Sequence, residues 1–158
     1  MQAIGASGGI CTIWKNGIWE LIQKKTYQHW IITNLNKIST RERYRVINIY
    51  APNHYKDKEQ CWASLKEILK ENQARKVILG GDLNLVRSIE ETFGGNYQTD
   101  PSRNSVEEIM EQHNLLDIPP NNGKYTWNNK RVGKSNIKER LDRILIQESI
   151  AAEYSSIK

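Results

Sequence analysis

The sequence predicts one domain of the α+β class. Strand-like segments come first in the chain, and two segments with helical spacing then interrupt the strands that follow, an order that favours an α+β or layered fold over a repeated βαβ unit. The 158 residues can bury a core, and their 38% hydrophobic and 26% charged content is typical of a globular protein. The longest apolar runs are too short to cross a bilayer and no signal-peptide pattern is present, so the sequence predicts neither a membrane span nor export.

The first half of the chain alternates apolar and polar residues in the manner of strands. A strand is predicted over 7–14 after a glycine bend, and one or two antiparallel strands are predicted over 19–35. A further strand over 44–50 ends before Pro52, because proline has no N–H for a strand ladder. The all-apolar segment 77–79 has the pattern of a central strand that is covered on both faces.

Apolar residues at helical spacing predict two amphipathic helices, over 56–72 and over 106–116. In the second helix, Ser105 is expected to cap the N-terminus, with Glu108 three residues further on. The remaining predicted elements are a turn at 119–123, extended structure at 125–127, a strand at 140–146 and a short helix at 148–154.

The net charge of +5 is concentrated between residues 124 and 143. Seven cations and two carboxylates in this window give an excess of five, which equals the net charge of the whole chain. The cations are Lys124, Lys130, Arg131, Lys134, Lys138, Arg140 and Arg143. Cations neutralise phosphates and the neighbouring Tyr125 and Trp127 can stack on bases, so the window predicts a nucleic-acid surface. A solvated, lysine-rich loop is an equal alternative on charge alone.

Neither a metal cluster nor a phosphate loop is indicated. Cys11 and Cys61 are far apart and belong to no Cys-x-x-Cys pair, so they are predicted to be reduced thiols, and the three histidines share no ligand spacing with them. Gly133-Lys134-Ser135 matches the end of a phosphate loop, but position 128 holds Asn128 where that loop requires glycine.

The predicted central strand runs into Gly80-Gly81-Asp82-Leu83-Asn84. If the strand continues, its period of two places Asp82 and Asn84 on one face. There the carboxylate could accept a proton from water or bind Mg²⁺, and the amide could bind a phosphate oxygen. The alternative is a glycine-rich turn in which the Asp and Asn side chains bond their own backbone, and the segment taken alone slightly favours this turn. Tyr50, taken alone, is more typical of a half-buried aromatic residue in a strand than of a catalytic phenol.

Five short motifs occur in order along the chain. They are Ser7-Gly8-Gly9-Ile10, Asn48-Ile49-Tyr50-Ala51-Pro52, Gly80-Gly81-Asp82-Leu83-Asn84, Tyr125-Thr126-Trp127 and Arg140-Leu141-Asp142-Arg143. The series resembles the endonuclease/exonuclease/phosphatase superfamily, the Mg²⁺-dependent phosphodiesterases that include apurinic endonucleases and DNase I. The last two motifs are most similar to the apurinic-endonuclease-like domain of LINE-type (non-LTR) retrotransposons. The resemblance covers about residues 3 to 154, and it implies a four-layer α/β/β/α sandwich of the DNase I-like type, here incomplete.

The resemblance also implies a role for each matching residue. Asp82 orients and helps to deprotonate the attacking water and is a weak ligand of Mg²⁺, or of Mn²⁺, while Asn84 holds that water or the phosphate. Tyr50 lies against the scissile phosphate, and Asp142 supports the polar network near the metal. The residues expected to contact DNA are Thr126, Trp127, Lys124, Arg131 and Arg140.

The superfamily pattern extends beyond both ends of this sequence. An Asn and a metal-binding Glu would precede residue 1, and a Ser-Asp-His strand would follow Lys158. Residues 1–158 are therefore predicted to be a partial domain, with a reverse transcriptase domain expected in the full-length polyprotein. The isolated chain is expected to bind Mg²⁺ weakly, to nick DNA negligibly and to aggregate through unpaired sheet edges. An intracellular location, in the nucleus or the cytoplasm, is expected.

Four functions are compatible with these observations. A DNA endonuclease domain, or its weakly active or inactive remnant, comes first because the basic window and Thr126 favour nucleic acid. A phosphatase or a lipid phosphodiesterase of the same superfamily comes second. A non-catalytic nucleic-acid-binding module would need the basic window but not Asp82, and a retained structural fragment would need neither.

Overall fold

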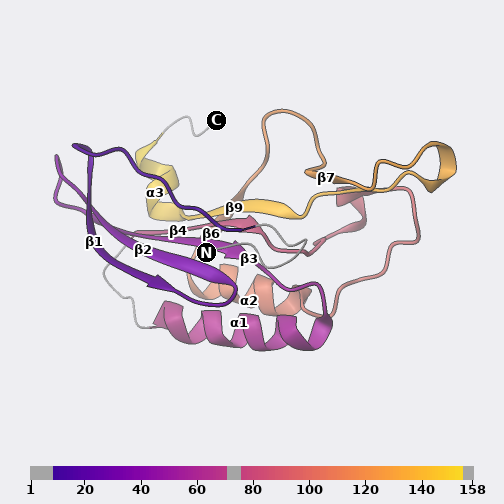
Figure 1. Ribbon diagram of the computed structural model, residues 1–158, viewed down its shortest axis with the longest axis horizontal. Helices are drawn as coiled ribbons and strands as arrows, with labels where there is room; N and C mark the ends of the chain where they lie inside the picture. Colours follow the sequence, from indigo (N-terminus) through magenta and orange to yellow (C-terminus); the bar gives the residue numbers. More distant parts are fainter. Residues whose placement is uncertain (1–8, 71–75, 155–158) are drawn as a thin grey trace.

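The computed structural model describes residues 9–70 and 76–154, and the strands within these ranges form two sheets (Figure 1). The main sheet has six strands in the order β1-β2-β3-β4-β9-β6, and the small sheet has three in the order β5-β8-β7. The strands are β1 (Trp19–Thr26), β2 (Trp30–Lys37), β3 (Arg43–Tyr50), β4 (Lys76–Asp82), β5 (Thr92–Phe93), β6 (Leu115–Ile118), β7 (Trp127–Asn128), β8 (Lys138–Glu139) and β9 (Asp142–Gln147). The helices are α1 (Tyr55–Lys70), α2 (Arg103–Gln112) and α3 (Glu148–Glu153).

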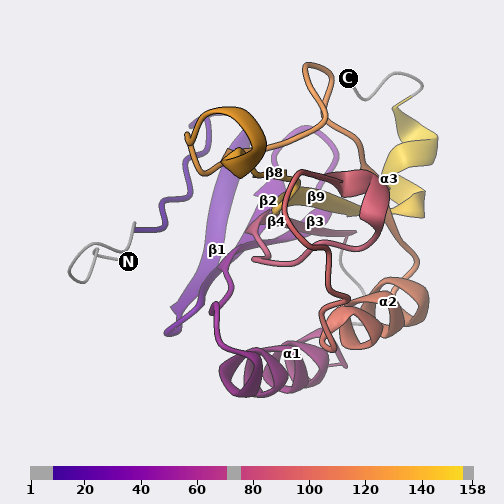
Figure 2. The ribbon, with the colours of Figure 1, turned by 90° about the vertical axis from the view of Figure 1, so that its right-hand side faces the viewer.

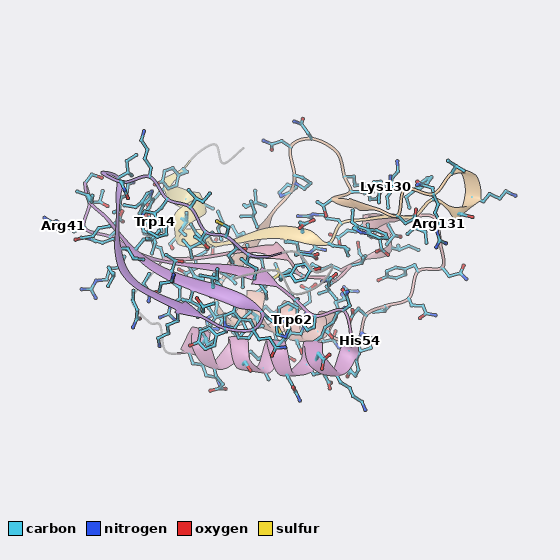
Figure 3. The ribbon with its side chains drawn as sticks, in the orientation of Figure 1. Trp14, Arg41, His54, Trp62, Lys130 and Arg131 are labelled. Carbon is cyan, nitrogen blue, oxygen red and sulfur yellow. The ribbon has the colours of Figure 1, made fainter. Side chains whose placement is uncertain are left out.

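Helices cover both faces of the main sheet. α1 and α2 lie side by side on one face, and α3 lies on the other (Figure 1 and Figure 2). The larger core fills the space between the sheet and α1 and α2, where Trp62 points from α1 toward the sheet (Figure 3) and joins Ile47 and Leu79. A smaller cluster lies between the sheet and α3 and includes Ile146 and Ile150. The predicted α+β class is confirmed. None of the helices in the described ranges is long and apolar enough to cross a membrane.

β4 lies in the middle of the main sheet, between β3 and β9. It runs parallel to β3, with α1 as the crossover connection, and antiparallel to β9. Val77 and Leu79 of β4 are buried in the larger core, whereas Ile78 packs against the smaller cluster on the other face. The prediction of a central strand covered on both faces is therefore confirmed. The helix predicted over 56–72 is found as α1. Residues 71 and 72 of the predicted range lie outside the described ranges.

The strand predicted over 7–14 is not found. No strand is assigned at residues 9–14, and residues 7 and 8 lie outside the described ranges. Asn48 of β3 donates a side-chain hydrogen bond to the carbonyl of Cys11 at 2.7 Å. At Cys11, therefore, a side chain and not a neighbouring strand satisfies the backbone carbonyl.

The helix predicted over 106–116 begins and ends earlier, as α2. The carboxylate of Asp100 accepts the backbone N–H two residues further on at 2.8 Å, so the turn before the helix is built around Asp100 and Ser105 lies inside the helix. At the other end, Asn114 has a φ of 49°, a left-handed conformation that stops a helix. Leu115 is buried as predicted, but it belongs to β6, which pairs with β9.

β1 and β6 form the two edges of the main sheet. All residues of β1 after Trp19 are exposed. An exposed edge strand offers unpaired N–H and C=O groups to other chains, so the aggregation expected from the sequence would begin at an edge such as β1. This expectation stays a prediction.

Candidate active site

Tyr50, Asp82 and Asp142 lie next to one another across three strands of the main sheet. In the register of the sheet, Tyr50 of β3 is paired with Asp82 of β4, and Asp82 is paired in turn with Asp142 of β9. Directly paired residues point to the same face, with Cβ atoms about 5 Å apart. Because side chains alternate along a strand, this row shares its face with Ile78 and Ile146 of the smaller cluster. The fold therefore brings three of the four predicted catalytic residues together on the face that carries α3.

Asn84 reaches this row through a turn and not through a continued strand. β4 ends at Asp82, and Asn84 has a φ of 47°. The backbone N–H of Asn84 donates to Oδ1 of Asp82 at 2.8 Å, which is the self-bonded turn that the segment alone slightly favoured. Nδ2 of Asn84 donates to the carbonyl of Ala51 at 2.5 Å, at the end of β3. Of the two alternatives for this segment, the structure has the turn and not the continued strand, and the turn bonds Asn84 to Ala51, the residue after Tyr50.

The environment of Asp82 favours its protonated form. Burial raises the pKa of the Asp82 carboxyl above its usual range, and the negative charge of Asp142 acts in the same direction. The Asn84 N–H and the ammonium of Lys58 offset part of this rise. A carboxylate with a raised pKa is better able to take a proton from water near neutral pH than an ordinary aspartate. A cation between the two carboxylates would reduce their mutual repulsion.

Thr126 fixes the backbone at the start of β9. Its Oγ1 accepts the backbone N–H groups of both Leu141 and Asp142, each at 3.0 Å. The strand predicted over 140–146 is found as β9, which begins two residues later, at Asp142, after these two bonds. Thr126 therefore lies beside the candidate site and helps to hold Asp142 in place, while the DNA contact expected of it stays a prediction.

An open cavity of about 520 Å³ lies beside Asp142 and Thr126. Ile118, Ile144 and two prolines supply apolar walls, and Asn121 is among its polar lining residues. The predicted turn at 119–123 forms part of this wall, so the turn lies close to the candidate site.

Sequence reasoning missed Lys58, which lies on the buried face of α1. Its ammonium donates to the carbonyl of Asn84 at 2.7 Å and forms an ion pair with Asp100. A signal was present in the sequence, because Lys58 occurs three and four residues before Cys61 and Trp62, on the apolar stripe of the predicted helix. A lysine on such a stripe requires a buried partner.

Two of the seven cations in the basic window are paired inside the protein. The side chain of Arg143 has no exposed surface, and its guanidinium contacts the carboxylates of Glu91 and Asp117. Arg140 contacts the same two carboxylates at 3.3 Å and 2.5 Å. Arg87 joins this network through Asp117 at 3.1 Å. The charge of Arg140 is therefore already balanced by carboxylates, which argues against the DNA contact predicted for it.

The remaining predicted DNA contacts lie on or beside the small sheet. Thr126, Trp127, Lys124 and Arg131 are all exposed. The ammonium of Lys124 lies 6.0 Å from the ring centre of Tyr125. Lys130 and Arg131 project from the loop beyond β7, past the end of the main sheet (Figure 3). The exposed cations after β7, Lys130, Arg131 and Lys134, thus lie on a projecting loop, whereas Arg140 and Arg143 are paired with carboxylates.

The candidate site offers few ligands for a metal ion. Among residues 9–70 and 76–154, no group of three or more His, Cys, Asp or Glu side chains is arranged to hold a metal. Asp82 and Asp142 are a pair of carboxylates in register. Mg²⁺ in proteins is commonly held by one or two carboxylates, with waters and substrate phosphates completing the shell, so this pair fits a weak Mg²⁺ site.

Comparison with known families and structures identifies the relatives of this fold. The family model described as "Endonuclease-reverse transcriptase" matches residues 44–158. This chain belongs to the endonuclease-reverse transcriptase family. No curated protein sequence matches it significantly. The endonuclease domain of TRAS1, a telomere-specific non-LTR retrotransposon, has the same fold with a TM-score of 0.64 and 17% identity, and the match covers 87% of this chain and 59% of that domain.

Two further solved structures share the fold. The 3′ phosphatase NExo from Neisseria, bound to a product DNA hairpin, has a TM-score of 0.59 and 21% identity, covering 81% of this chain and 55% of NExo. A mannosyl-6-phosphatase from Bacteroides thetaiotaomicron has a TM-score of 0.58 and 14% identity, covering 86% of this chain and 55% of that protein. The chain spans between half and two thirds of the length of these proteins. Together with the family match, they confirm the resemblance to the endonuclease/exonuclease/phosphatase superfamily and to the LINE-type endonuclease.

The paired arginines predict an acid-sensitive stability for this endonuclease-reverse transcriptase chain. Burial opposes the ionisation of Glu91, but hydrogen bonds from Arg143 and from the Arg87 backbone leave the pKa of Glu91 below its usual range. The hydrogen bond from Arg87 lowers the pKa of Glu107 as well. Carboxyls with lowered pKa values stabilise the fold above their unfolded pKa, and this stabilisation is lost as the pH falls through the folded pKa.

We therefore expect the free energy of unfolding to fall between about pH 5 and pH 3, as carboxyls with ordinary pKa values near 4.3 become protonated in the unfolded chain. Urea unfolding at several pH values measures this slope. Glu91→Gln removes one of the titrating groups and should flatten the slope, whereas an exposed control, Glu111→Gln, should leave it unchanged. An equal slope in all three proteins would contradict the expectation.

Proposed function

We propose that this chain belongs to a Mg²⁺-dependent DNA endonuclease domain that hydrolyses phosphodiester bonds and nicks target DNA during retrotransposition. The observation that carries the proposal is the row of Tyr50, Asp82 and Asp142, with Asn84 turned back beside it. The family description adds a reverse transcriptase domain as the expected partner in the full-length polyprotein. An intracellular location, in the nucleus or the cytoplasm, accompanies this proposal.

Each side chain of the row has a role that its chemistry can supply. Asp82 orients the attacking water and takes its proton. Asn84 donates its remaining amide hydrogen to that water or to a phosphate oxygen, and the Tyr50 hydroxyl donates to the phosphate. Asp82 and Asp142 would hold Mg²⁺, or Mn²⁺, and the ion would neutralise charge on the phosphate. Since the described residues bring two carboxylates together at this place and form no larger ligand group, we expect weak metal binding and very slow nicking by this chain.

Surface chemistry favours nucleic acid as the substrate. Lys124 and Arg131 are exposed beside the aromatic ring of Trp127, of which 43% is exposed. Cations that follow a phosphate backbone and an aromatic ring that stacks on a base are the features of nucleic-acid surfaces. A phosphatase or a lipid phosphodiesterase of the same superfamily would use the same row without needing these side chains. The exposed loop therefore favours DNA over a phosphorylated sugar or a lipid.

Nicking of supercoiled plasmid in the presence of Mg²⁺ tests the proposal. Wild-type nicking is expected to be very slow, so it is followed at high protein concentration over long incubations. Asp82→Asn preserves the shape of the side chain and is expected to abolish this residual nicking, because it removes the general base. Asp57→Asn, an exposed aspartate of α1, is the matched control and should nick at the wild-type rate. Equal nicking by the wild type and by Asp82→Asn would overturn the assignment of the site.

A second measurement separates catalysis from binding alone. Gel-shift titrations should give Asp82→Asn the affinity of the wild type, while Arg131→Ala should bind more weakly and with a smaller salt dependence. Broadening of the Asp82 and Asn84 amide signals by Mn²⁺ reports the metal site without requiring turnover. DNA binding without either nicking or Mn²⁺ broadening would favour the non-catalytic nucleic-acid-binding module.

A further inference from the structure

Lys58 is a charged side chain in the interior of the protein. It lies in the first half of α1, and only 6% of its side chain is exposed. Burying an ammonium is costly unless it is paired and hydrogen-bonded. Lys58 therefore requires partners that offset the free energy of desolvating its ammonium, and the identity of those partners indicates what Lys58 does.

The ammonium of Lys58 joins three segments that are distant in the sequence. It donates to the carbonyl of Asn84, after β4, at 2.7 Å, and it pairs with the carboxylate of Asp100, before α2. The second oxygen of Asp100 accepts the backbone N–H of Ser102 at 2.8 Å. Asp100 is thus held at the start of α2, and through it the ammonium of Lys58 is held against Asn84.

Asn84 is fixed at three points, each by a different element. Its N–H is held by Asp82 of β4, its side-chain nitrogen by the carbonyl of Ala51 after β3, and its carbonyl by Lys58 of α1. The φ of 47° at Asn84 is a left-handed conformation, which asparagine adopts more readily than most residues, and the three contacts together hold Asn84 in it. Of the three contacts, the one from Lys58 can be removed without changing Asp82, Asn84 or the ends of β3 and β4.

We propose that Lys58 is a positioning residue for the candidate active site. Its ammonium, balanced by Asp100, holds the left-handed turn at Asn84 and thereby keeps the Asn84 amide and the Asp82 carboxylate in the arrangement that hydrolysis uses. The consequence for hydrolysis rests on the proposed function, whereas the anchoring of the turn can be measured without it. A side chain that only filled space in α1 would leave the Asn84 turn unchanged when replaced by another of equal volume.

The test uses Lys58→Met/Asp100→Asn, which removes both charges and preserves most of the buried volume. Replacing both members of a buried pair is often tolerated, whereas removing one leaves an uncompensated charge. We expect hydrogen exchange at the backbone N–H of Asn84 to accelerate roughly tenfold or more. Exchange at Leu65, in the core of α1, should stay within about twofold. Lys58→Arg keeps the charge and should retain the slow exchange at Asn84.

Nicking kinetics of the same variants connect the turn to the reaction. The rate at saturating DNA should fall about tenfold or more in the double variant, with the DNA concentration at half-maximal rate unchanged, because Lys58 does not touch the exposed loop. Lys58→Arg, which keeps the charge, should nick at the wild-type rate. If the double variant does not fold, Lys58→Leu/Asp100→Asn, which also removes both charges and the contact with Asn84, is measured in its place, and the same selective acceleration at Asn84 is expected.

The possible outcomes separate this proposal from the proposed function. Unchanged exchange at Asn84, or equal acceleration at Asn84 and Leu65, would overturn the positioning role even if the wild type nicks DNA. Selective acceleration at Asn84 in a chain that neither nicks DNA nor binds Mn²⁺ would leave the anchoring intact and would overturn the proposed function instead.

Discussion

Gly81→Ala is expected to lower the free energy of unfolding by about 4 kcal/mol or more, a large part of the stability of a typical domain. Gly81 has a φ of 131°, and a Cβ atom there would lie 2.0 Å from the carbonyl oxygen of Ile49. The atom in the way is backbone in the parallel ladder between β3 and β4, in the middle of the main sheet, so it cannot move without breaking strand pairing. Urea unfolding followed by tryptophan fluorescence measures the loss.

The neighbouring Gly80→Ala is the matched control. Its Cβ would lie 3.5 Å from the carbonyl oxygen of Arg143 and 3.8 Å from Cγ1 of Ile144, which are ordinary contacts. We expect a change in the free energy of unfolding within about 1 kcal/mol. Equal losses in the two alanine variants would contradict the clash at Gly81 and with it the close approach of β3 to β4.

Arg143→Met is expected to cost about 3–5 kcal/mol of the free energy of unfolding, because it leaves two carboxylates with less positive charge in a buried place. The side chain of Arg143 has no exposed surface, and those of Glu91 and Asp117 are 14% and 10% exposed. Because Arg140 still contacts both carboxylates, we expect a loss near the lower limit, about 3 kcal/mol. The loss should depend little on added salt, since buried pairs are weakly screened.

Arg131→Met is the control for this substitution, because Arg131 is exposed on the projecting loop. We expect a change within about 0.5 kcal/mol, together with weaker DNA binding. Arg143 and Arg131 should thus have different effects. Substitution of Arg143 should lower stability, and substitution of Arg131 should lower DNA affinity. A large loss of stability in Arg131→Met, or none in Arg143→Met, would contradict the division of the window into a buried network and an exposed loop.

Local patterns in the sequence predicted several elements correctly because the signal for each lies within a few neighbouring residues. Alternation and β-branched residues predicted the strands that became β1, β2 and β3, and helical spacing predicted α1. The ends of elements were less accurate. α2 begins at a turn made by Asp100 and ends at the left-handed Asn114, and neither contact is part of the apolar stripe that predicted the helix.

The motif series predicted which residues would gather at the site, but not how they would do so. Tyr50, Asp82 and Asp142 are brought together by strand register across β3, β4 and β9. The sequence left both a strand and a turn open for the segment after β4. The carbonyl of Ala51 and the ammonium of Lys58 come from other elements, and they help to hold Asn84 in the turn.

The sequence by itself determined the class of the fold, the order of its main elements and the identity of the residues around Asp82, because periodicity and short motifs are local properties of a chain. The tertiary structure decided which charges are free. Arg140 and Arg143 look like surface cations in the sequence, yet they pair with Glu91 and Asp117, which are 23 to 52 residues away along the chain. Lys58 likewise reads as one charge on an amphipathic helix, until Asn84 and Asp100 are placed against it. Pairing of charges depends on distances in space, and a sequence pattern does not contain them.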